Sequence, residues 1–165
     1  MRVGFALGSN LGDRLANLQL GRKELCDRLE DPEPLCSSLY ETQPVDCPPG
    51  SSTFYNTVIE LQTDLSPEQL LMITQSIEAA AGRVPSETTN APRELDIDIL
   101  YMGQESVETA VLKIPHPSLH ERSFVLQPLA EIRPELELPG LPTIQCLLQV
   151  MPDEEFAPVK IQSEW

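Results

Sequence analysis

Two segments of this chain have the residue spacing of amphipathic helices, and strand-forming segments stand before, between and after them. The first helical pattern follows an apolar strand at residues 2–7 and continues until Pro32 interrupts it. The second pattern begins with Ser66 and Pro67, which suit a helix N-terminus, and it ends near Gly82. We therefore expect each helix to connect two strands.

The strand patterns between and after the helices lie at residues 35–42, 54–63 and 95–102. The order strand, helix, strand, strand, helix, strand matches the split βαβ arrangement. We therefore predict an α+β fold, with a ferredoxin-like split βαβ sheet, helices and additional C-terminal elements. These additional elements are a short strand and two helices, near residues 107, 125–132 and 143–150.

The length of 165 residues and the apolar fraction of 41% suit one domain with one core. We predict a single domain over residues 1–165, with a weakly packed tail from about residue 152. No run approaches the roughly 18 apolar residues of a membrane span, and the first residues lack the pattern of an export signal. The four cysteines form no CxxC pair, which favours reduced thiols in a cytoplasmic protein.

The net charge of −15 limits the partners of the chain. An acidic surface repels nucleic acid and anionic membranes, so we expect neither, and no obligatory protein partner is evident. The cations are unevenly spread, because no Lys or Arg occurs from Leu29 to Gly82. Four follow in one later stretch, namely Arg83, Arg93, Lys113 and Arg122. A local cationic site for an anionic ligand is therefore compatible with the acidic composition.

Acidic and apolar residues alternate at residues 95–100. The two-residue period of a strand places Asp96 and Asp98 on one face and the apolar residues on the other. Two neighbouring carboxylates repel unless water or a cation lies between them, and hard oxygen ligands of this kind suit Mg²⁺ and its substrate phosphates. A metal site at these aspartates is the functional interpretation, and a half-exposed strand in an acidic protein is the alternative.

Candidate phosphate donors flank the two aspartates in the sequence. Arg93 precedes them, while His116 and Arg122 follow in a segment that could return to the same sheet edge. Surface salt bridges are the alternative for the arginines. His116 and His120 have the spacing of a zinc pair, but flanking prolines and the lack of a third ligand disfavour zinc. The glycine-containing segment 8–12 lacks a phosphate-loop fingerprint, so we predict a structural role for it.

An ordered set of motifs closely resembles the 6-hydroxymethyl-7,8-dihydropterin pyrophosphokinases. The match runs from about residue 4 to residue 136. The motifs are ALGSNLG at 6–12, FYN at 54–56, LSPE at 65–68, IE at 77–78, GR at 82–83, PRELDIDIL at 92–100, IPHP at 114–117 and RSFVL at 122–126. The patterns around the aspartates and around His116 are specific in combination.

The resemblance implies an enzyme of folate biosynthesis that transfers pyrophosphate from ATP to a reduced hydroxymethyl pterin and releases AMP. It also implies two Mg²⁺ ions held by Asp96 and Asp98. The catalytic residues that it implies are Arg83, Arg93, Asp96 and Asp98. The ATP contacts that it implies are Gln75, Glu78, Arg93, His116 and Arg122. The pterin contacts that it implies are Thr42, Val45, Phe54, Asn56 and Phe124.

The chain departs from the family pattern between residues 83 and 92. The family usually has a second arginine two residues after Gly-Arg and an Arg-Trp-Gly before Pro-Arg, where this chain has Pro85 and Thr89-Asn90-Ala91. A cation and an aromatic ring that help to close the site are therefore missing. The alternative function is a catalytically weakened member that binds nucleotide or pterin.

Overall fold

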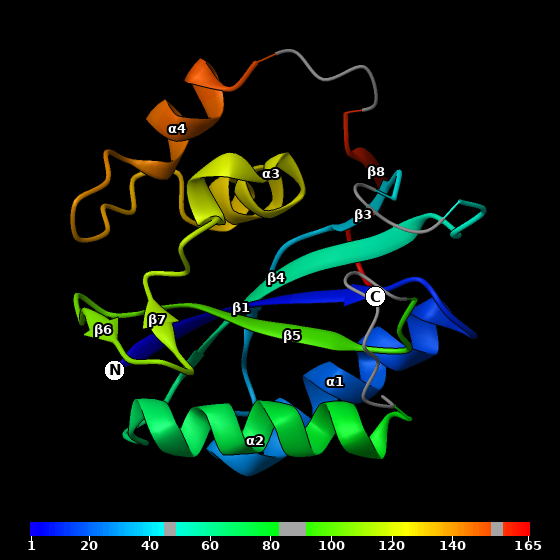
Figure 1. Cartoon of the computed structure of the whole chain (residues 1–165), viewed down its shortest axis with the longest axis horizontal. Coiled ribbons are helices and arrows are strands. Elements are labelled where there is room, and N and C mark those ends of the chain that lie inside the picture. Colours follow the sequence, from blue (N-terminus) through cyan, green and yellow to red (C-terminus); the bar gives the residue numbers. More distant parts are fainter. Residues whose placement is uncertain (45–48, 83–91, 153–156) are drawn as a thin grey trace.

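A six-stranded sheet carries helices on both faces in the computed structural model of the chain (Figure 1). The structure describes residues 1–44, 49–82, 92–152 and 157–165. Its elements in chain order are β1 (Arg2–Ser9), α1 (Arg14–Leu29), β2 (Leu35–Cys36), β3 (Leu39–Thr42), β4 (Phe54–Gln62), α2 (Pro67–Ala80), β5 (Asp96–Met102), β6 (Val107–Glu108), β7 (Lys113–Ile114), the 3-10 helix η1 (Leu119–Glu121), α3 (Ser123–Ile132), α4 (Ile144–Val150) and β8 (Val159–Gln162).

The strand order confirms the α+β fold class predicted from the sequence. The main sheet runs β5-β1-β4-β3-β8, with β2 also paired to β4, and its described strands pair antiparallel. The first four strands in this order, connected through α1 and α2, form the split βαβ unit. Figure 1 shows α1 and α2 below the sheet and α3 and α4 above it. The sheet is therefore covered on both sides.

Alternation along β1 divides the side chains between two hydrophobic cores. Val3, Phe5 and Leu7 are buried in the core that includes residues of α1 and α2. Ala6 points to the opposite face and packs against a second core, which includes residues of α3 and α4. The prediction of one core therefore needs correction, because the C-terminal helices cover the face that α1 and α2 leave open. We call this second face the α3 face.

Local caps explain where the two long helices begin. The Asp13 carboxylate accepts a hydrogen bond from Ala16 N at 3.1 Å at the start of α1. Ser66 and Gln69 form the predicted capping box at α2, with Ser66 Oγ accepting from Gln69 N at 3.3 Å and Gln69 Oε1 accepting from Ser66 N at 2.9 Å. Within the described residues, no helix has the length and apolarity that crossing a membrane requires.

The predicted strand at 35–42 is divided into β2 and β3 at two buried serines. Ser37 N donates to Val58 O at 2.8 Å, and the Ser37 hydroxyl accepts from Val58 N at 2.9 Å. The side chain thus replaces a backbone partner and allows the strand to bend without leaving polar groups unpaired.

The described part of the C-terminal tail has contacts that its lack of apolar periodicity did not predict. β8 pairs with β3 through the backbone, although its side chains are mostly exposed. Trp165 is half-buried, and its indole donates to Ser37 O at 3.0 Å. Arg22 lies over the Trp165 ring, with its Cζ 4.5 Å from the ring centroid. Residues 159–165 are therefore attached to the sheet and to α1.

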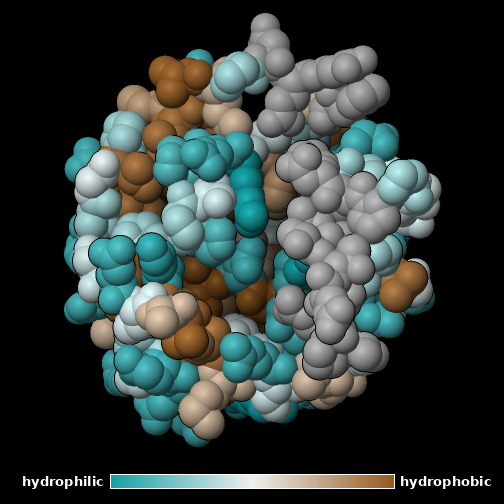
Figure 2. Space-filling model, viewed as in Figure 1, coloured by the Kyte–Doolittle hydropathy of each residue, from teal (hydrophilic) through white to brown (hydrophobic). Residues whose placement is uncertain are grey.

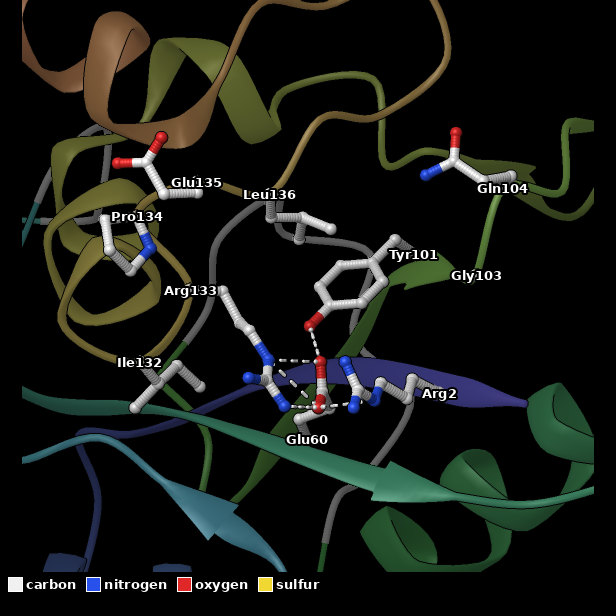
Figure 3. Close-up of a pocket in the computed structure, with 10 residues that line it drawn as sticks. All are labelled: Arg2, Glu60, Tyr101, Gly103, Gln104, Ile132, Arg133, Pro134, Glu135 and Leu136. Atoms are coloured by element: carbon white, nitrogen blue, oxygen red, sulfur yellow. Dashed lines mark hydrogen bonds and ion pairs between the residues drawn. The ribbon is translucent and has the colours of Figure 1, made fainter.

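A buried carboxylate, Glu60, organises a charged cluster at one end of the α3 face (Figure 3). Arg133 donates to both of its oxygens at 2.5–3.2 Å, and the Tyr101 hydroxyl donates at 2.7 Å. Arg2 lies 3.7 Å away with its side chain largely exposed. The cluster borders a cavity of about 520 Å³. Glu60 therefore ties β4, β5 and the end of α3 together.

The Tyr101 ring depends on a glycine in the neighbouring strand. Gly4 pairs with Tyr101 across β1 and β5, and a Cβ atom on Gly4 would overlap the ring. The missing side chain thus lets Tyr101 lie across β1 and reach Glu60.

Candidate active site

The edge strand β5 presents Asp96 and Asp98 on the α3 face of the sheet. Ile97 and Ile99, which alternate with them, are buried in the opposite core. The two carboxylates remain partly accessible, with 26% of the Asp96 side chain and 35% of the Asp98 side chain exposed. The structure therefore places both aspartates on one face, as the alternating pattern predicted.

The three predicted phosphate donors converge on this acidic pair. Arg93 Nη1 donates to Asp96 Oδ1 at 2.8 Å. Arg122 Nη1 lies 3.4 Å from Asp98 Oδ2, and His116 Nε2 lies 3.9 Å from the same oxygen. The donors come from three segments of the chain, before β5, after β7 and before α3, so folding assembles a mixed anionic and cationic site.

The electrostatic environment of Asp98 favours an additional positive charge. Burial, and then the adjacent Asp96, raise the pKa of the Asp98 carboxyl above its ordinary value. His116, Arg122 and Arg93 lower this pKa but do not cancel the rise. Two partly exposed carboxylates on one strand, of which that of Asp98 is incompletely compensated, are a donor set that fits Mg²⁺, which takes one or two protein carboxylates together with substrate phosphates.

The His116 ring is oriented by its own backbone neighbourhood. His116 N donates to Leu100 O at 2.8 Å, and the ring Nδ1 accepts from Ser118 N at 3.2 Å. The proton of the neutral ring therefore lies on Nε2, which faces Asp98. Burial lowers the pKa of His116, Asp98 raises it in part and Arg122 lowers it further.

Asn10 fixes the backbone of Arg93 and was not identified as a site residue from the sequence. Asn10 N donates to Arg93 O at 3.2 Å, and Arg93 N donates to Asn10 Oδ1 at 2.9 Å. The Asn10 residue is only 2% exposed. These reciprocal bonds hold the start of the β5 segment against the end of β1. Segment 8–12 therefore supports the site directly, in addition to forming a turn.

Two residues of α2 were predicted to contact ATP. Glu78 is buried, and its Oε1 accepts from Ile97 N at 2.8 Å, between the two aspartates. Gln75 is exposed one turn earlier on the same helix. The structure thus brings Glu78 next to the acidic pair and leaves Gln75 on the surface of α2.

A cavity of about 340 Å³ adjoins the acidic pair. It lies between α2, β5 and residues 109–117, and Asp98 and His116 form part of its wall. Apolar side chains also line it, among them Leu71 and Leu112. The sequence did not identify these two residues as lining a site, because apolar residues with such spacing are typical of a core. In Figure 2 hydrophilic side chains border a furrow on this side of the molecule, and hydrophobic ones lie deeper within it.

Three of the residues predicted to bind the pterin, Thr42, Phe54 and Asn56, lie on β3 and β4, on the other side of β1 from β5. Asn56 Nδ2 donates to Thr42 Oγ1 at 2.6 Å, and both residues are buried. Phe54 pairs with Thr42 in the sheet, and its side chain is half-buried. Phe124 is the second residue of α3, and the Arg122 Cζ lies 5.7 Å from its ring centroid. Polar edges and flat apolar surfaces are thus available together.

Several predicted residues lie outside the described part of the chain. Val45 and Arg83 belong to this group, as do the atypical residues Pro85 and Asn90. Among the described residues, no group of three or more His, Cys, Asp and Glu side chains gathers as metal ligands. His120, the second member of the zinc pair that was disfavoured, is exposed and lies 3.7 Å from Glu121.

Comparisons with known proteins identify the family of the chain. Residues 4–134 match the model of the 7,8-dihydro-6-hydroxymethylpterin-pyrophosphokinase (HPPK) family. The 2-amino-4-hydroxy-6-hydroxymethyldihydropteridine pyrophosphokinase of Bacillus subtilis (strain 168) is 42% identical over 133 residues, covering 81% of this chain and 78% of that protein. The protein of that name from Pseudomonas aeruginosa is 38% identical over 154 residues, covering 93% of each chain.

A solved structure shows the same fold. Plasmodium falciparum HPPK-DHPS with pteroate aligns with 90% of this chain at a TM-score of 0.67 and 17% identity. This chain spans 42% of that longer one. The chain therefore belongs to the HPPK family, on the strength of the family match and of relatives that it covers along most of their length.

Proposed function

We propose that this chain transfers the β- and γ-phosphates of ATP, as one pyrophosphoryl group, to 6-hydroxymethyl-7,8-dihydropterin in folate biosynthesis. Membership of the HPPK family and the enzymes named among its relatives support this function. The structural observation that carries the proposal is the convergence of Arg93, His116 and Arg122 on the pair Asp96 and Asp98. ATP and the reduced pterin are the two substrates.

The two aspartates would hold magnesium, and we propose two ions as the resemblance implies. The donor set fits, since the carboxylates are adjacent and partly exposed, and that of Asp98 is incompletely compensated by its cationic neighbours. Bound Mg²⁺ would neutralise charge on the phosphate oxygens. The protein side chains contribute by binding and alignment.

Cationic and polar groups beside the aspartates would bind the polyphosphate. Arg93 and Arg122 supply charged donors, and the Nε2 proton of His116 supplies a directed one. We propose that Gln75 and Glu78 also contact ATP. The cavity between α2, β5 and residues 109–117 would accept the base of ATP, since its wall joins apolar side chains to Asp98 and His116. The transferred phosphates would then lie over the acidic pair.

The transfer itself requires an aligned acceptor. The hydroxymethyl oxygen attacks the β-phosphorus, and the bond from that phosphorus to the oxygen bridging to the α-phosphate breaks. AMP leaves with the bridging oxygen, and the hydroxyl proton passes to water. Catalysis of this kind depends on positioning and electrostatic stabilisation, which the arginines would provide for the charge that develops on the phosphates.

The pterin would lie on the other side of β1. Asn56 can donate and accept hydrogen bonds at a pterin edge, and Thr42 already orients its amide. Phe54 and Phe124 would offer flat surfaces to the ring. Val45, outside the described residues, is proposed as a further contact.

A coupled assay for AMP tests the proposed function. The parent protein with ATP, Mg²⁺ and the reduced pterin should form AMP and the pterin pyrophosphate in equal amounts, and chelation of Mg²⁺ should stop both. Nucleotide binding without AMP formation would instead identify a catalytically weakened member of the family.

A variant of Asn56 tests the assignment of the pterin side. Asn56→Ala should weaken pterin binding by about 1–3 kcal/mol, because complementary polar edges would be left unpaired. ATP binding to the same variant, measured by calorimetry, serves as the internal control and should change little. An equal loss for both ligands in a stably folded variant would contradict a dedicated pterin contact.

A further inference from the structure

An arginine at the start of α1 supplies a positive charge to two strands that carry none of their own. No Lys or Arg occurs from Leu29 to Gly82, the stretch that contains β3 and β4. Arg14 Nη1 lies 3.1 Å from Glu41 Oε1, at the end of β3. The same nitrogen lies 2.9 Å from Thr53 O and 2.6 Å from Thr53 Oγ1, directly before β4. One guanidinium therefore joins three segments of the chain.

The other contacts in this cluster hold the guanidinium in place. The Arg14 Cζ lies 3.8 Å from the centroid of the Tyr55 ring, which is the geometry of a cation–π contact. The Thr53 hydroxyl donates to Glu41 Oε1 at 2.7 Å. The hydrogen bond from Thr53, and then those from Arg14, lower the pKa of Glu41 although burial raises it in part. The carboxylate is thus kept charged beside Arg14, whose side chain is only 25% exposed.

The cluster lies where the β3–β4 ladder ends. Thr42 and Phe54 form the last backbone pair of this ladder, and Thr53 follows outside it. The ends of elements open most readily in a folded protein. Because Arg14 holds Thr53 to the neighbour of Thr42, it fastens the chain one residue beyond the last pair.

Arg14 and the proposed pterin contacts lie on opposite faces of the sheet. Glu41 pairs with Tyr55 across the ladder, and Tyr55 packs against the core that includes residues of α1 and α2. Alternation places the next pair, Thr42 and Phe54, on the α3 face. Any effect of Arg14 on a ligand at that face must therefore pass through the backbone of the two strands.

We propose that Arg14 is a positioning residue for the pterin, which acts by closing the end of the β3–β4 ladder and does not contact the ligand. This inference rests on the proposed function, in which Thr42 and Phe54 contact the pterin. With Arg14 in place, these two residues keep one spacing in the free protein. Binding then does not have to order them, and that preorganisation increases affinity.

A kinetic experiment on Arg14→Gln tests the inference. The KM for the reduced hydroxymethyl pterin should rise about 10-fold, while kcat and the KM for ATP stay within about 2-fold, because binding of one substrate alone is weakened. Calorimetry with 6-hydroxymethylpterin should show the same loss of affinity. In Arg14→Lys the KM for the pterin should rise only about 3-fold, because lysine keeps the charge but lacks the planar group that lies over Tyr55.

Arg133→Gln is the matched control at the other end of the sheet. Arg133 follows α3 and also pairs with a carboxylate of a central strand, Glu60 on β4. This variant should lower the melting temperature at least as much as Arg14→Gln and leave the KM for the pterin unchanged. If pterin affinity instead fell in proportion to stability in both variants, Arg14 would have only a general structural role and the inference would be overturned.

Thr53→Val shows whether Arg14 acts through the ladder end, and it keeps the inference testable if Arg14→Gln fails to fold. Valine keeps the shape and removes the hydroxyl that lies between Arg14 and Glu41. The KM for the pterin should rise about 5-fold, and the double variant should lose little more affinity than Arg14→Gln alone. Additive losses, or a parental KM in Thr53→Val, would overturn the inference. If the parent binds no pterin and forms no AMP, the proposed function fails, which is a result distinct from failure of the role of Arg14.

Discussion

Glu60 and Asp98 are carboxylates on the same face of one sheet, yet their surroundings differ. The Glu60 side chain is 5% exposed and has close partners, with Arg133 on both oxygens and Tyr101 at 2.7 Å. The Asp98 side chain is 35% exposed, and its neighbours Arg122 and His116 lie 3.4 and 3.9 Å away. A second carboxylate, Asp96, adds repulsion at Asp98 alone.

The pKa shifts of the two groups run in opposite directions. Burial raises the pKa of Glu60, but hydrogen bonds from Arg133 and Tyr101 outweigh it and the net pKa is lowered. At Asp98 burial and Asp96 prevail, and the pKa is raised. A carboxylate with close, matched partners stabilises the fold, whereas one left with incomplete compensation is suited to receive a cation or a ligand.

The largest expected effect separates function from stability at the acidic pair. Asp98→Asn, and likewise Asp96→Asn, should reduce pyrophosphoryl transfer at least about 100-fold. The free energy of unfolding of Asp98→Asn should stay level or rise, because asparagine keeps the shape and removes like-charge repulsion. Asp96→Asn should be less stable than Asp98→Asn, because it also removes the charge that pairs with Arg93 at 2.8 Å. Rapid-quench kinetics and urea denaturation measure the two quantities. Parental turnover of both variants at saturating Mg²⁺ and ATP would show that the metal site is assigned wrongly.

The converse is expected at Glu60. Glu60→Gln should lower the free energy of unfolding by about 2 kcal/mol, because the half-buried Arg133 loses its counter-charge. Turnover by the folded variant should remain within about 2-fold of the parent, since no proposed ligand contact is changed. Urea denaturation with an unchanged m-value checks the first quantity. A large loss of turnover with an unchanged free energy of unfolding would contradict the proposed difference between the Glu60 cluster and the acidic pair.

Acidification should act on the Glu60 cluster in a predictable direction. Because the pKa of Glu60 is lowered in the folded state, its stabilising contribution is present above the unfolded-state pKa and is lost as the pH falls through the folded pKa. Between about pH 5 and pH 3, the parent should therefore lose more unfolding free energy than Glu60→Gln. Parallel pH profiles of the two proteins would argue against this linkage.

The smallest effect concerns the two arginines around Glu60. Arg2 is 61% exposed at 3.7 Å, so Arg2→Gln should cost less than about 0.5 kcal/mol. Arg133→Gln should cost more, about 1–2 kcal/mol, because it removes the close hydrogen bonds to both carboxylate oxygens. Thermal or urea unfolding of the pair would reveal the order. Equal losses of unfolding free energy in the two variants would show that the distance of each arginine from Glu60 does not determine how much it stabilises the fold.

Local chemistry made most of the fold predictable from the sequence. The capping box at Ser66 and the alternation around Asp96 act over a few residues, and the structure contains both as expected. The β8 pairing was not predictable, because it uses backbone groups while its side chains are exposed and carry no pattern. The second core was not predicted for a related reason. The spacing of apolar residues identifies the apolar face of each helix or strand, but it does not show which faces pack against each other.

The candidate site was likewise predictable from the sequence only in part. The convergence of Arg93, His116 and Arg122 on the aspartates followed from residue chemistry together with an assumed return of the chain. Asn10 was missed because it contributes hydrogen bonds to the backbone of Arg93, which is distant in the sequence. No residue pattern around Asn10 predicts such bonds. Leu71 was missed because a cavity wall and a packed core use the same apolar side chains.

The contact between Tyr101 and Gly4 limits the order in which these positions can change during evolution. A side chain at position 4 is excluded while the tyrosine ring lies across β1. Loss of the tyrosine meets no such steric barrier, although it removes a hydrogen bond from Glu60. Substitutions at these two positions should therefore occur in a fixed order, with position 101 changing first and position 4 afterwards. Among relatives, a side chain at position 4 should accompany a smaller residue at position 101.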